Sequence, residues 1–162
     1  MKKIVLIIIL FVYSNPNYSQ SVDFNINLLG GAKEKTASIS SGDIDNDGDV
    51  DIIIANGRHW PGQNKILLNN GKGGFTVEKD LGSERLTSYA AELSDFDGDG
   101  DLDLFVGGRV SPKAYPKPGQ SFLLRNDSKL GKISFKDVTK QWSPSLPEVG
   151  MVSDFLWTDF NN

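Results

Sequence analysis

The sequence predicts an all-β chain of β-propeller blades, and two observations carry this prediction. A nine-residue acidic pattern occupies 43–51 and 95–103, and its opening recurs at 159–162, so the copies begin 52 and 64 residues apart. The same order of short apolar stretches and Gly-rich turns follows each complete copy. Four short strands per repeat at this spacing are typical of propeller blades, and a closed ring needs roughly four to eight of them. We therefore expect two four-stranded blades and the first strand of a third, in an incomplete ring.

The first blade is expected over 36–80. Small residues at 36–42 lead into the acidic loop, and the apolar run that follows it, 51–55, is typical of a buried strand. Further strands are expected at 65–69 and from Phe75 to Val77, joined by a turn rich in Asn and Gly at 70–74.

The second blade is expected over 86–140, with strands at 88–94, 103–106, 123–126 and 133–135. Aligning the repeats sets Gly107-Gly108-Arg109 against Asn56-Gly57-Arg58, and Leu123–Asn126 against Leu67–Asn70. A third blade is expected to begin over 150–162, where residues 155–158 approach the last acidic loop as a strand. Whether Asp159 and Asn161 complete a further metal site stays open. The chain is expected to be the N-terminal part of a longer protein whose remaining blades complete the ring.

The first 20 residues are expected to be a signal peptide. Lys2 and Lys3 precede nine apolar residues, 4–12, which are too few to span a bilayer as a helix. Cleavage is expected near Ser19 or Gln20, with a site after Ser14 and an uncleaved anchor as alternatives. Residues 21–35 are expected to hold an N-terminal strand, 22–28, and a linker. The protein is thus expected to be secreted. Its expected location is either extracellular or in the cell envelope, which means the periplasm or the cell surface.

The amino-acid composition excludes some ways of stabilising the fold and bears on nucleic-acid binding. The chain has no cysteine, which excludes disulfides and a lipoprotein anchor. A secreted chain without disulfides needs another source of stability, and a bound metal can supply it. Ten of its 21 acidic residues lie in the two loops, so the acidity is local and gives no support for nucleic-acid binding.

The acidic loops are expected to bind Ca²⁺. Five carboxylates in nine residues repel one another, since two of them about 5 Å apart cost roughly 3 kcal/mol at an effective dielectric constant of ~20. An all-oxygen ligand set suits a hard cation, and a flexible loop suits Ca²⁺ better than Mg²⁺. An acidic surface turn without a metal is the alternative. The candidate ligands are Asp43, Asp45, Asp47, Asp49, Asp51, Asp95, Asp97, Asp99, Asp101 and Asp103.

The pattern differs from an EF-hand in its second half. An EF-hand needs a Glu at position 12 and flanking helices, whereas position 12 here is Ile54 or Val106 and the loop runs into a strand. Positions 1, 3 and 5 are expected to coordinate through side chains, position 7 through its backbone carbonyl, and position 9, Asp51 or Asp103, as the closing ligand. Gly at position 6 permits the sharp turn.

These features resemble the FG-GAP/VCBS repeats, calcium-binding propeller repeats found in integrin α chains and in secreted bacterial proteins. The residues that carry the resemblance are 42–51, 66–75 and 94–107, and Val106-Gly107-Gly108 is similar to the Gly-rich end of the motif, without its Ala-Pro. Residues 121–126 and 137–139 also resemble the cartilage acidic protein branch. The resemblance covers residue 36 to the end, and it implies a propeller of about seven blades, braced by calcium, that acts in adhesion or ligand binding.

Other residues offer weaker candidates. His59 is the single histidine, which excludes a His/Cys zinc site and argues against a catalytic triad. Trp60 and Tyr115 lie in corresponding Pro-rich loops and are expected either to stack on a sugar or peptide or to cover a blade edge. Arg58 and Arg109 are expected to pair with acids or carbonyls near the loops.

The sequence therefore predicts a non-enzymatic, secreted calcium-binding β-propeller module that serves as a binding or adhesion scaffold for an extracellular protein or carbohydrate. The aspartates are expected to be ionised metal ligands, which argues against acid–base catalysis by them. The alternative is the accessory propeller of a secreted carbohydrate-active enzyme, such as a polysaccharide lyase, with its catalytic residues outside this chain.

Overall fold

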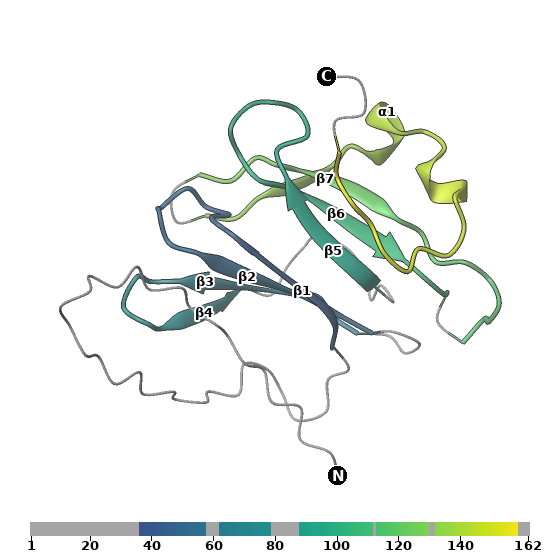
Figure 1. Cartoon of the computed structure of the whole chain (residues 1–162), viewed down its shortest axis with the longest axis horizontal. Helices are drawn as coiled ribbons and strands as arrows, with labels where there is room; N and C mark the ends of the chain where they lie inside the picture. The colour runs from purple at the N-terminus through teal and green to yellow at the C-terminus, as the bar shows by residue number, and fades with distance from the viewer. Residues whose placement is uncertain (1–35, 58–61, 79–87, 112, 130–131, 159–162) are drawn as a thin grey trace, which may run out of the picture. The chain divides into compact units, whose positions relative to one another are not determined.

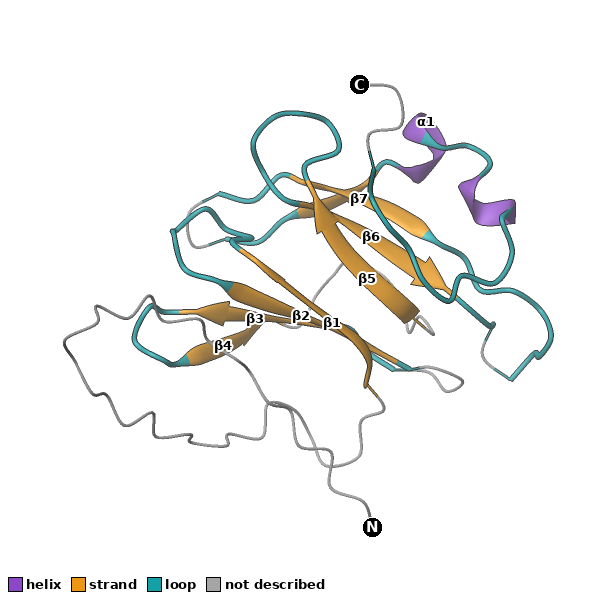
Figure 2. Ribbon diagram, viewed as in Figure 1, coloured by secondary structure: helices purple, strands orange, loops and turns teal. Residues whose placement is uncertain are grey.

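The described part of the chain consists mainly of two antiparallel sheets. The computed structural model describes residues 36–57, 62–78, 88–111, 113–129 and 132–158. Each sheet has four strands that neighbour one another in sequence order, and the sheets do not close into a ring (Figures 1 and 2). The predicted all-β class and the two four-stranded units are confirmed. The strands are β1 (Thr36–Gly42), β2 (Asp51–Asn56), β3 (Lys65–Asn69), β4 (Phe75–Glu78), β5 (Ser88–Ser94), β6 (Asp103–Gly108), β7 (Phe122–Asn126) and β8 (Phe135–Asp137).

The acidic loops are the connections between the first two strands of each sheet. Gly42 pairs with Asp51 where β1 meets β2, and Ser94 pairs with Asp103 where β5 meets β6. The strands that leave the loops, β2 and β6, are buried at every residue, as their continuous apolar runs predict. A fully buried inner strand of each sheet therefore begins at the last aspartate of an acidic loop.

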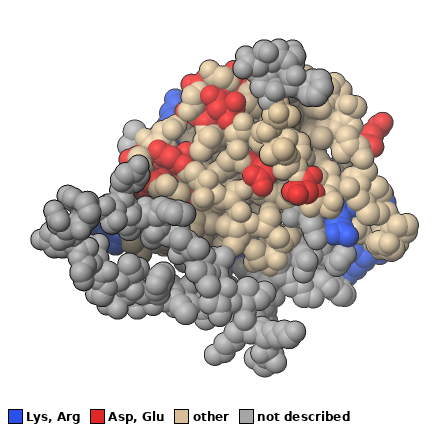
Figure 3. Space-filling view, viewed as in Figure 1, with Lys and Arg blue, Asp and Glu red and all other residues tan. Residues whose placement is uncertain are grey.

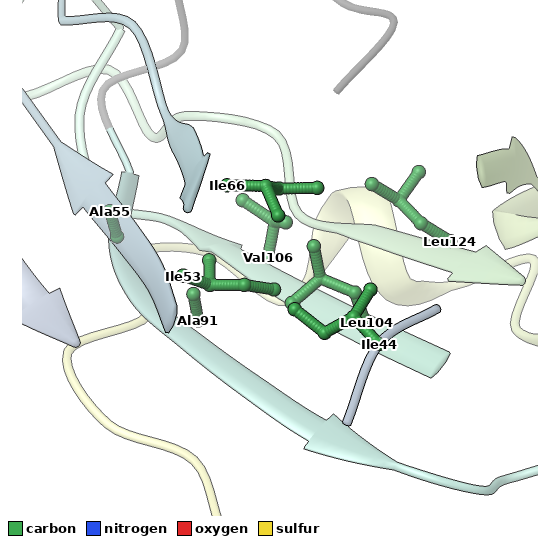
Figure 4. Packing of buried hydrophobic residues seen from close by; sticks show 8 residues of the cluster. All are labelled: Ile44, Ile53, Ala55, Ile66, Ala91, Leu104, Val106 and Leu124. Carbon is green, nitrogen blue, oxygen red and sulfur yellow. The ribbon is translucent and has the colours of Figure 1, made fainter. Parts of the chain in front are cut away.

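A shared hydrophobic core joins the two sheets. Figure 4 shows side chains of β2 and β3 directed toward those of β5, β6 and β7, together with Ile44 from the first acidic loop. Polar contacts accompany this packing, because the Ser40 hydroxyl donates to the Ala91 carbonyl at 2.6 Å and the Ala91 N–H donates to the Ser38 hydroxyl at 3.0 Å. The buried members of this core are Ile44, Ile53, Ala55, Ile66, Ala91, Leu104, Val106 and Leu124.

An aromatic cluster covers the other face of the second sheet. Phe105, on β6, is buried and stacks on Phe155 with ring centroids 3.9 Å apart. Two short helices that the sequence analysis did not predict, α1 (Thr139–Trp142) and η1 (Leu146–Glu148), lie in this covering segment. Helices of four and three residues are too short to show a helical period, which is why they escaped prediction.

Two strand predictions need correction. The fourth strand of the second repeat lies at 135–137 rather than 133–135, because the Ser134 carbonyl is already used in the preceding turn, where it accepts from the Asp127 N–H at 2.7 Å. The first strand of a third blade, expected within 150–162, is not formed over 150–158. A strand requires a neighbouring strand, and this segment instead packs on β6, where the Val152 N–H donates to the Gly108 carbonyl at 3.0 Å.

Backbone pairing also shifts the predicted alignment of the repeats by one residue at two places. Asn126 corresponds to Asn69 rather than to Asn70, because each donates its backbone N–H to the last aspartate of its own loop. Gly108, not Gly107, corresponds to Asn56, because each pairs with the first residue of the first strand of its sheet. Consecutive Leu, Gly and Asn residues allowed either alignment in the sequence alone.

Several predictions lie outside the described residues. These are the signal peptide at 1–20, the strand and linker at 21–35, and the third loop with Asp159 and Asn161. Among the described residues, no helix is long and apolar enough to cross a membrane.

Candidate metal centres

The first acidic loop wraps around its own first carboxylate. Asp43 accepts hydrogen bonds from the backbone N–H groups of Asp47 at 3.1 Å and Gly48 at 3.0 Å, and the Asp47 carboxylate accepts from the Asp49 N–H at 2.9 Å. Gly48 has a φ of 92° and Asn46 a φ of 60°, a left-handed conformation that Gly and Asn adopt most readily. These turns bend the chain so that neighbouring carboxylates converge.

The second loop repeats this arrangement. Asp95 accepts from the backbone N–H groups of Gly98 at 2.7 Å, Asp99 at 3.1 Å and Gly100 at 3.0 Å. Gly98 and Gly100 have φ values of 78° and 97°. The left-handed residue at position 6 was predicted, whereas the one at position 4 was not. The signal for it was present, since position 4 holds Asn in one copy and Gly in the other.

The aspartate at position 9 fastens the loop to the sheet. Asp51 has no exposed surface, and its two oxygens accept from the backbone N–H groups of Ile44 at 2.9 Å and Asn69 at 2.8 Å. Asp103 is equally buried and makes the corresponding two bonds in the second repeat, at 3.0 Å and 2.8 Å. The sequence pattern predicts this position only as the closing metal ligand. The structure adds a second role, because each carboxylate ties the start of its loop to the end of the third strand.

Three carboxylates converge in each loop. One oxygen from each member of the group lies within 4.8 Å of the others. In the first loop Asp45 is only 6% exposed, and its Oδ1 atom is buried without a hydrogen-bond partner. A buried carboxylate oxygen that accepts no hydrogen bond costs free energy. A bound cation would supply the missing partner, so this group of three carboxylates fits a metal site. The two groups are Asp43, Asp45 and Asp51, and Asp95, Asp97 and Asp99.

Burial makes three of the loop carboxylates, those of Asp45, Asp51 and Asp103, reluctant to ionise without a cation. Desolvation is the main cause that raises the pKa of Asp45, and the neighbouring charges of Asp47 and Asp51 raise it further. Desolvation likewise raises the pKa values of Asp51 and Asp103, although their backbone hydrogen bonds partly oppose this effect. Ionised oxygens gathered under these conditions suit a hard divalent cation.

The side chains at position 7 lie in neither group of three. The Asp49 carboxylate lies against Gly71 in the turn between β3 and β4, where a Cβ atom on that glycine would come within 2.5 Å of it. The Asp101 carboxylate accepts a hydrogen bond from the Asn46 side chain of the first loop. Both arrangements agree with coordination through the backbone carbonyl at this position, which stays a prediction. Asp47 and Asp103 are likewise absent from the group of three in their own loop.

Three residues near the loops were not recognised from the sequence as part of the sites. Asn69 and Asn126 support the position-9 aspartates, and the signal for them was an Asn that ends the third strand of both repeats. Arg125 carries a positive charge that interacts with Asp97 and Asp99, while its guanidinium pairs with Asp127 at 2.8 Å. The first repeat has Leu68 at the place of Arg125, so the two sites differ in charge.

The remaining candidates are peripheral to these sites. Tyr115 is 78% exposed. It lies in a loop in which the Ser111 N–H donates to the Lys117 carbonyl at 2.8 Å. Arg109 is half-buried at the end of β6, and its expected pairing near the loops stays a prediction. Arg58, His59 and Trp60 lie outside the described residues. Figure 3 shows acidic side chains in several separate groups on this face, with basic side chains at its edges.

Comparison with known proteins identifies the repeat. Residues 43–106, which include both acidic loops, match the FG-GAP-like repeat family. The chain contains an FG-GAP-like repeat. No curated protein and no solved structure matches the chain. FG-GAP repeats form modules of the β-propeller type, often bind calcium and are typical of extracellular proteins, in agreement with the two four-stranded sheets described above.

Proposed function

We propose that the chain is a secreted calcium-binding β-propeller module that serves as a non-catalytic scaffold for binding or adhesion. The observation that carries the calcium proposal is the buried Oδ1 atom of Asp45, which lacks a donor and belongs to a group of three converging carboxylates. The FG-GAP-like repeat at 43–106 supports the module and its place outside the cell. The cartilage acidic protein branch remains part of this proposal on sequence resemblance alone.

The residues proposed to hold the ion divide into two classes. Asp43, Asp45 and Asp47 supply side-chain oxygens at positions 1, 3 and 5, and their counterparts do so in the second loop. The aspartates at position 9 have lone pairs left after accepting two backbone hydrogen bonds, so they can close the ligand set while they hold the loop to the sheet. When bound, Ca²⁺ supplies positive charge that offsets the repulsion among the carboxylates.

The position of the loops explains how such a site would serve a scaffold. Each loop connects the first two strands of a sheet, and its last aspartate is bonded to the third strand. Ordering the loop therefore fixes three strands of one repeat relative to one another. A rigid set of strands presents connecting loops for recognition, and the exposed Tyr115 is a suitable contact for an extracellular protein or carbohydrate.

The carboxylates are better suited to this role than to catalysis. In both loops the aspartates at positions 1 and 9 accept backbone hydrogen bonds through both oxygens. General acid–base chemistry requires a carboxyl group within reach of a substrate, whereas Asp51 and Asp103 have no exposed surface. The proposal therefore includes no catalytic residue.

Calorimetric titration with Ca²⁺, and with Mg²⁺ in parallel, tests the metal site. We expect binding selective for Ca²⁺ with dissociation constants of roughly 10⁻⁴ to 10⁻³ M, the usual range of extracellular calcium modules. Asp45→Asn should remove one site, and Asp154→Asn, an exposed aspartate outside the loops, should leave both sites intact. No heat on addition of Ca²⁺, or equal affinity for both ions, would contradict the calcium proposal.

A second measurement tests the scaffold. The chain is applied to arrays of extracellular proteins and polysaccharides with Ca²⁺ and again after chelation with EDTA. We expect binding that depends on Ca²⁺, weakens for Tyr115→Ala and leaves the ligand chemically unchanged. Release of a cleaved or modified ligand would contradict the non-catalytic role and support the enzyme alternative.

A further inference from the structure

We propose that Asn126 is a positioning residue shared by the two acidic loops, so that Ca²⁺ bound at one loop raises the affinity of the other. This inference rests on the calcium sites proposed above. Asn126 ends β7 in the second repeat and is only 1% exposed. Its side-chain nitrogen donates to the carbonyl of Ile44 in the first loop at 2.9 Å and to that of Leu102 in the second loop at 3.0 Å. One buried amide group thus contacts both loops.

These contacts are part of a continuous path of hydrogen bonds between the loops. The Asp51 carboxylate accepts from the Ile44 N–H at 2.9 Å, and the Ile44 carbonyl accepts from the Asn126 side chain. The backbone N–H of Asn126 then donates to the Asp103 carboxylate at 2.8 Å. Two residues therefore connect the position-9 aspartate of one site with that of the other.

The first repeat contains a matched residue without the connection. Asn69 donates its N–H to Asp51, its side chain donates to the Val50 carbonyl, and its side-chain oxygen accepts from the Gly71 N–H. Asn126 makes the same three kinds of bond within its own repeat. The bond to Ile44 is the additional one. Asn69 therefore serves as an internal control for what the asparagine does within one repeat.

A second contact joins the loops at the surface. The Asn46 side chain, at position 4 of the first loop, donates to the Asp101 carboxylate at position 7 of the second. Asn46 is exposed and has a φ of 60°, while the corresponding residue of the second loop is Gly98. Glycine is thus already accommodated at this position of the loop, so Asn46→Gly removes the contact without straining the backbone.

The free-energy cost of ordering a loop explains why binding at one loop should strengthen binding at the other. A loop of mutually repelling carboxylates must be fixed in one conformation when the ion binds, and fixing it costs conformational entropy. Binding at the first loop holds Asp51 and, through it, the backbone of Ile44. The carbonyl of Ile44 holds Asn126, which in turn holds Asp103, so part of the cost of ordering the second loop is already met. A second ligand that meets a partly ordered site binds more tightly.

Calorimetric Ca²⁺ titration of the whole chain and of single-site variants measures this coupling. The affinity of the second loop is compared between the unmodified chain and Asp45→Asn, which disables the first loop. We expect the second loop to bind about tenfold more weakly when the first is disabled, within the usual range of coupling between sites. The ratio of these two affinities of the second loop is then measured again in chains that also carry Asn126→Ala, Asn46→Gly or Asn69→Ala.

The variants separate coupling from simple structural support. Asn126→Ala and Asn46→Gly should each bring the ratio closer to one, whereas Asn69→Ala should change the first site but keep the ratio. A ratio of one in the unmodified chain, or a ratio that Asn126→Ala leaves unchanged, overturns this inference while leaving the calcium sites standing. If Asn126→Ala does not fold, Asn126→Leu, which fills the space but lacks the two N–H donors, replaces it in the same test. Absence of Ca²⁺ binding at both loops overturns the inference and the proposed function together.

Discussion

The Oδ1 atom of Asp103 lies 2.8 Å from the backbone nitrogen of Asn126, and its other oxygen accepts from the Phe96 N–H at 3.0 Å. The same pair of bonds occurs at Asp51 in the first repeat. A residue expected only as a metal ligand is therefore also a buried acceptor for two backbone donors. The two roles predict different results when the metal is removed.

Asp103→Ala should destabilise the protein even without calcium. The substitution leaves two backbone donors without their acceptor, at about 1–3 kcal/mol each when they stay buried, so unfolding should become easier by about 2–6 kcal/mol. Urea denaturation in EDTA measures this. Asp99→Ala, at an exposed position of the same loop, is the control and should cost much less under those conditions. Equally small losses for both variants would show that Asp103 has no structural role apart from metal binding.

The comparison of sequence and structure shows which features a local pattern can predict. The acidic loops and the strands beside them were predictable because their spacing, Gly positions and apolar runs are local in the sequence. The path from Ile44 to Asn126 was not, since it joins residues 82 positions apart that only the packing of two sheets brings together. The same limit applies to Phe155, which was expected in a strand and instead stacks on Phe105.

Asp47→Ala should weaken calcium binding at the first loop about tenfold or more, because it removes a charged side-chain ligand at position 5. Asp49→Ala should weaken it less than about threefold, because position 7 is expected to coordinate through its backbone and its carboxylate lies against Gly71. Calorimetry on both variants in an Asp97→Asn background isolates the first loop. Equal losses for the two variants would show that position 7 binds through its carboxylate.

Calcium binding at the first loop should weaken on mild acidification. Burial raises the pKa of Asp45 above the ordinary value of 3.8, so its carboxylate takes up a proton at a higher pH than an exposed one does. Protons then compete with Ca²⁺ for this ligand, and the affinity falls as the pH falls toward the raised pKa. Calcium titrations across the acidic range measure this, with Asp45→Asn as control. An affinity that stays constant until close to pH 3.8 would contradict the raised pKa.

In EDTA, where no Ca²⁺ is bound, the contribution of Asp45 to the stability of the fold changes with pH in the opposite direction to the calcium affinity. Because the folded chain binds a proton at Asp45 more tightly than the unfolded chain does, the contribution of Asp45 to stability falls as the pH rises from about 3.8 through the raised pKa. Thermal unfolding of the chain and of Asp45→Asn over this range isolates the contribution. As the pH rises, the stability of Asp45→Asn against thermal unfolding should increase relative to that of the unmodified chain. A shift the other way would contradict the assignment.

Leu104→Ala should destabilise the contact between the two sheets. Leu104 has no exposed surface and belongs to the core shared by both sheets, so the cavity should cost about 2–5 kcal/mol of unfolding free energy. Leu156→Ala is the control, since that side chain is 82% exposed and its loss should cost little. Urea denaturation compares the variants. Two separate transitions in Leu104→Ala would show that each sheet unfolds independently once the shared core is weakened.

Arg125→Leu should strengthen calcium binding at the second loop several-fold, because it removes a positive charge that interacts with Asp97 and Asp99 and places there the residue type of the first repeat. The gain should shrink at high salt, which screens charges near the surface. Calorimetry in an Asp45→Asn background, at low and high ionic strength, follows the second loop alone. Arg125→Lys keeps the charge and should leave the affinity nearly unchanged. If Arg125→Leu instead weakens binding, the pairing of Arg125 with Asp127 at 2.8 Å serves chiefly to hold the end of β7 in place for the second loop.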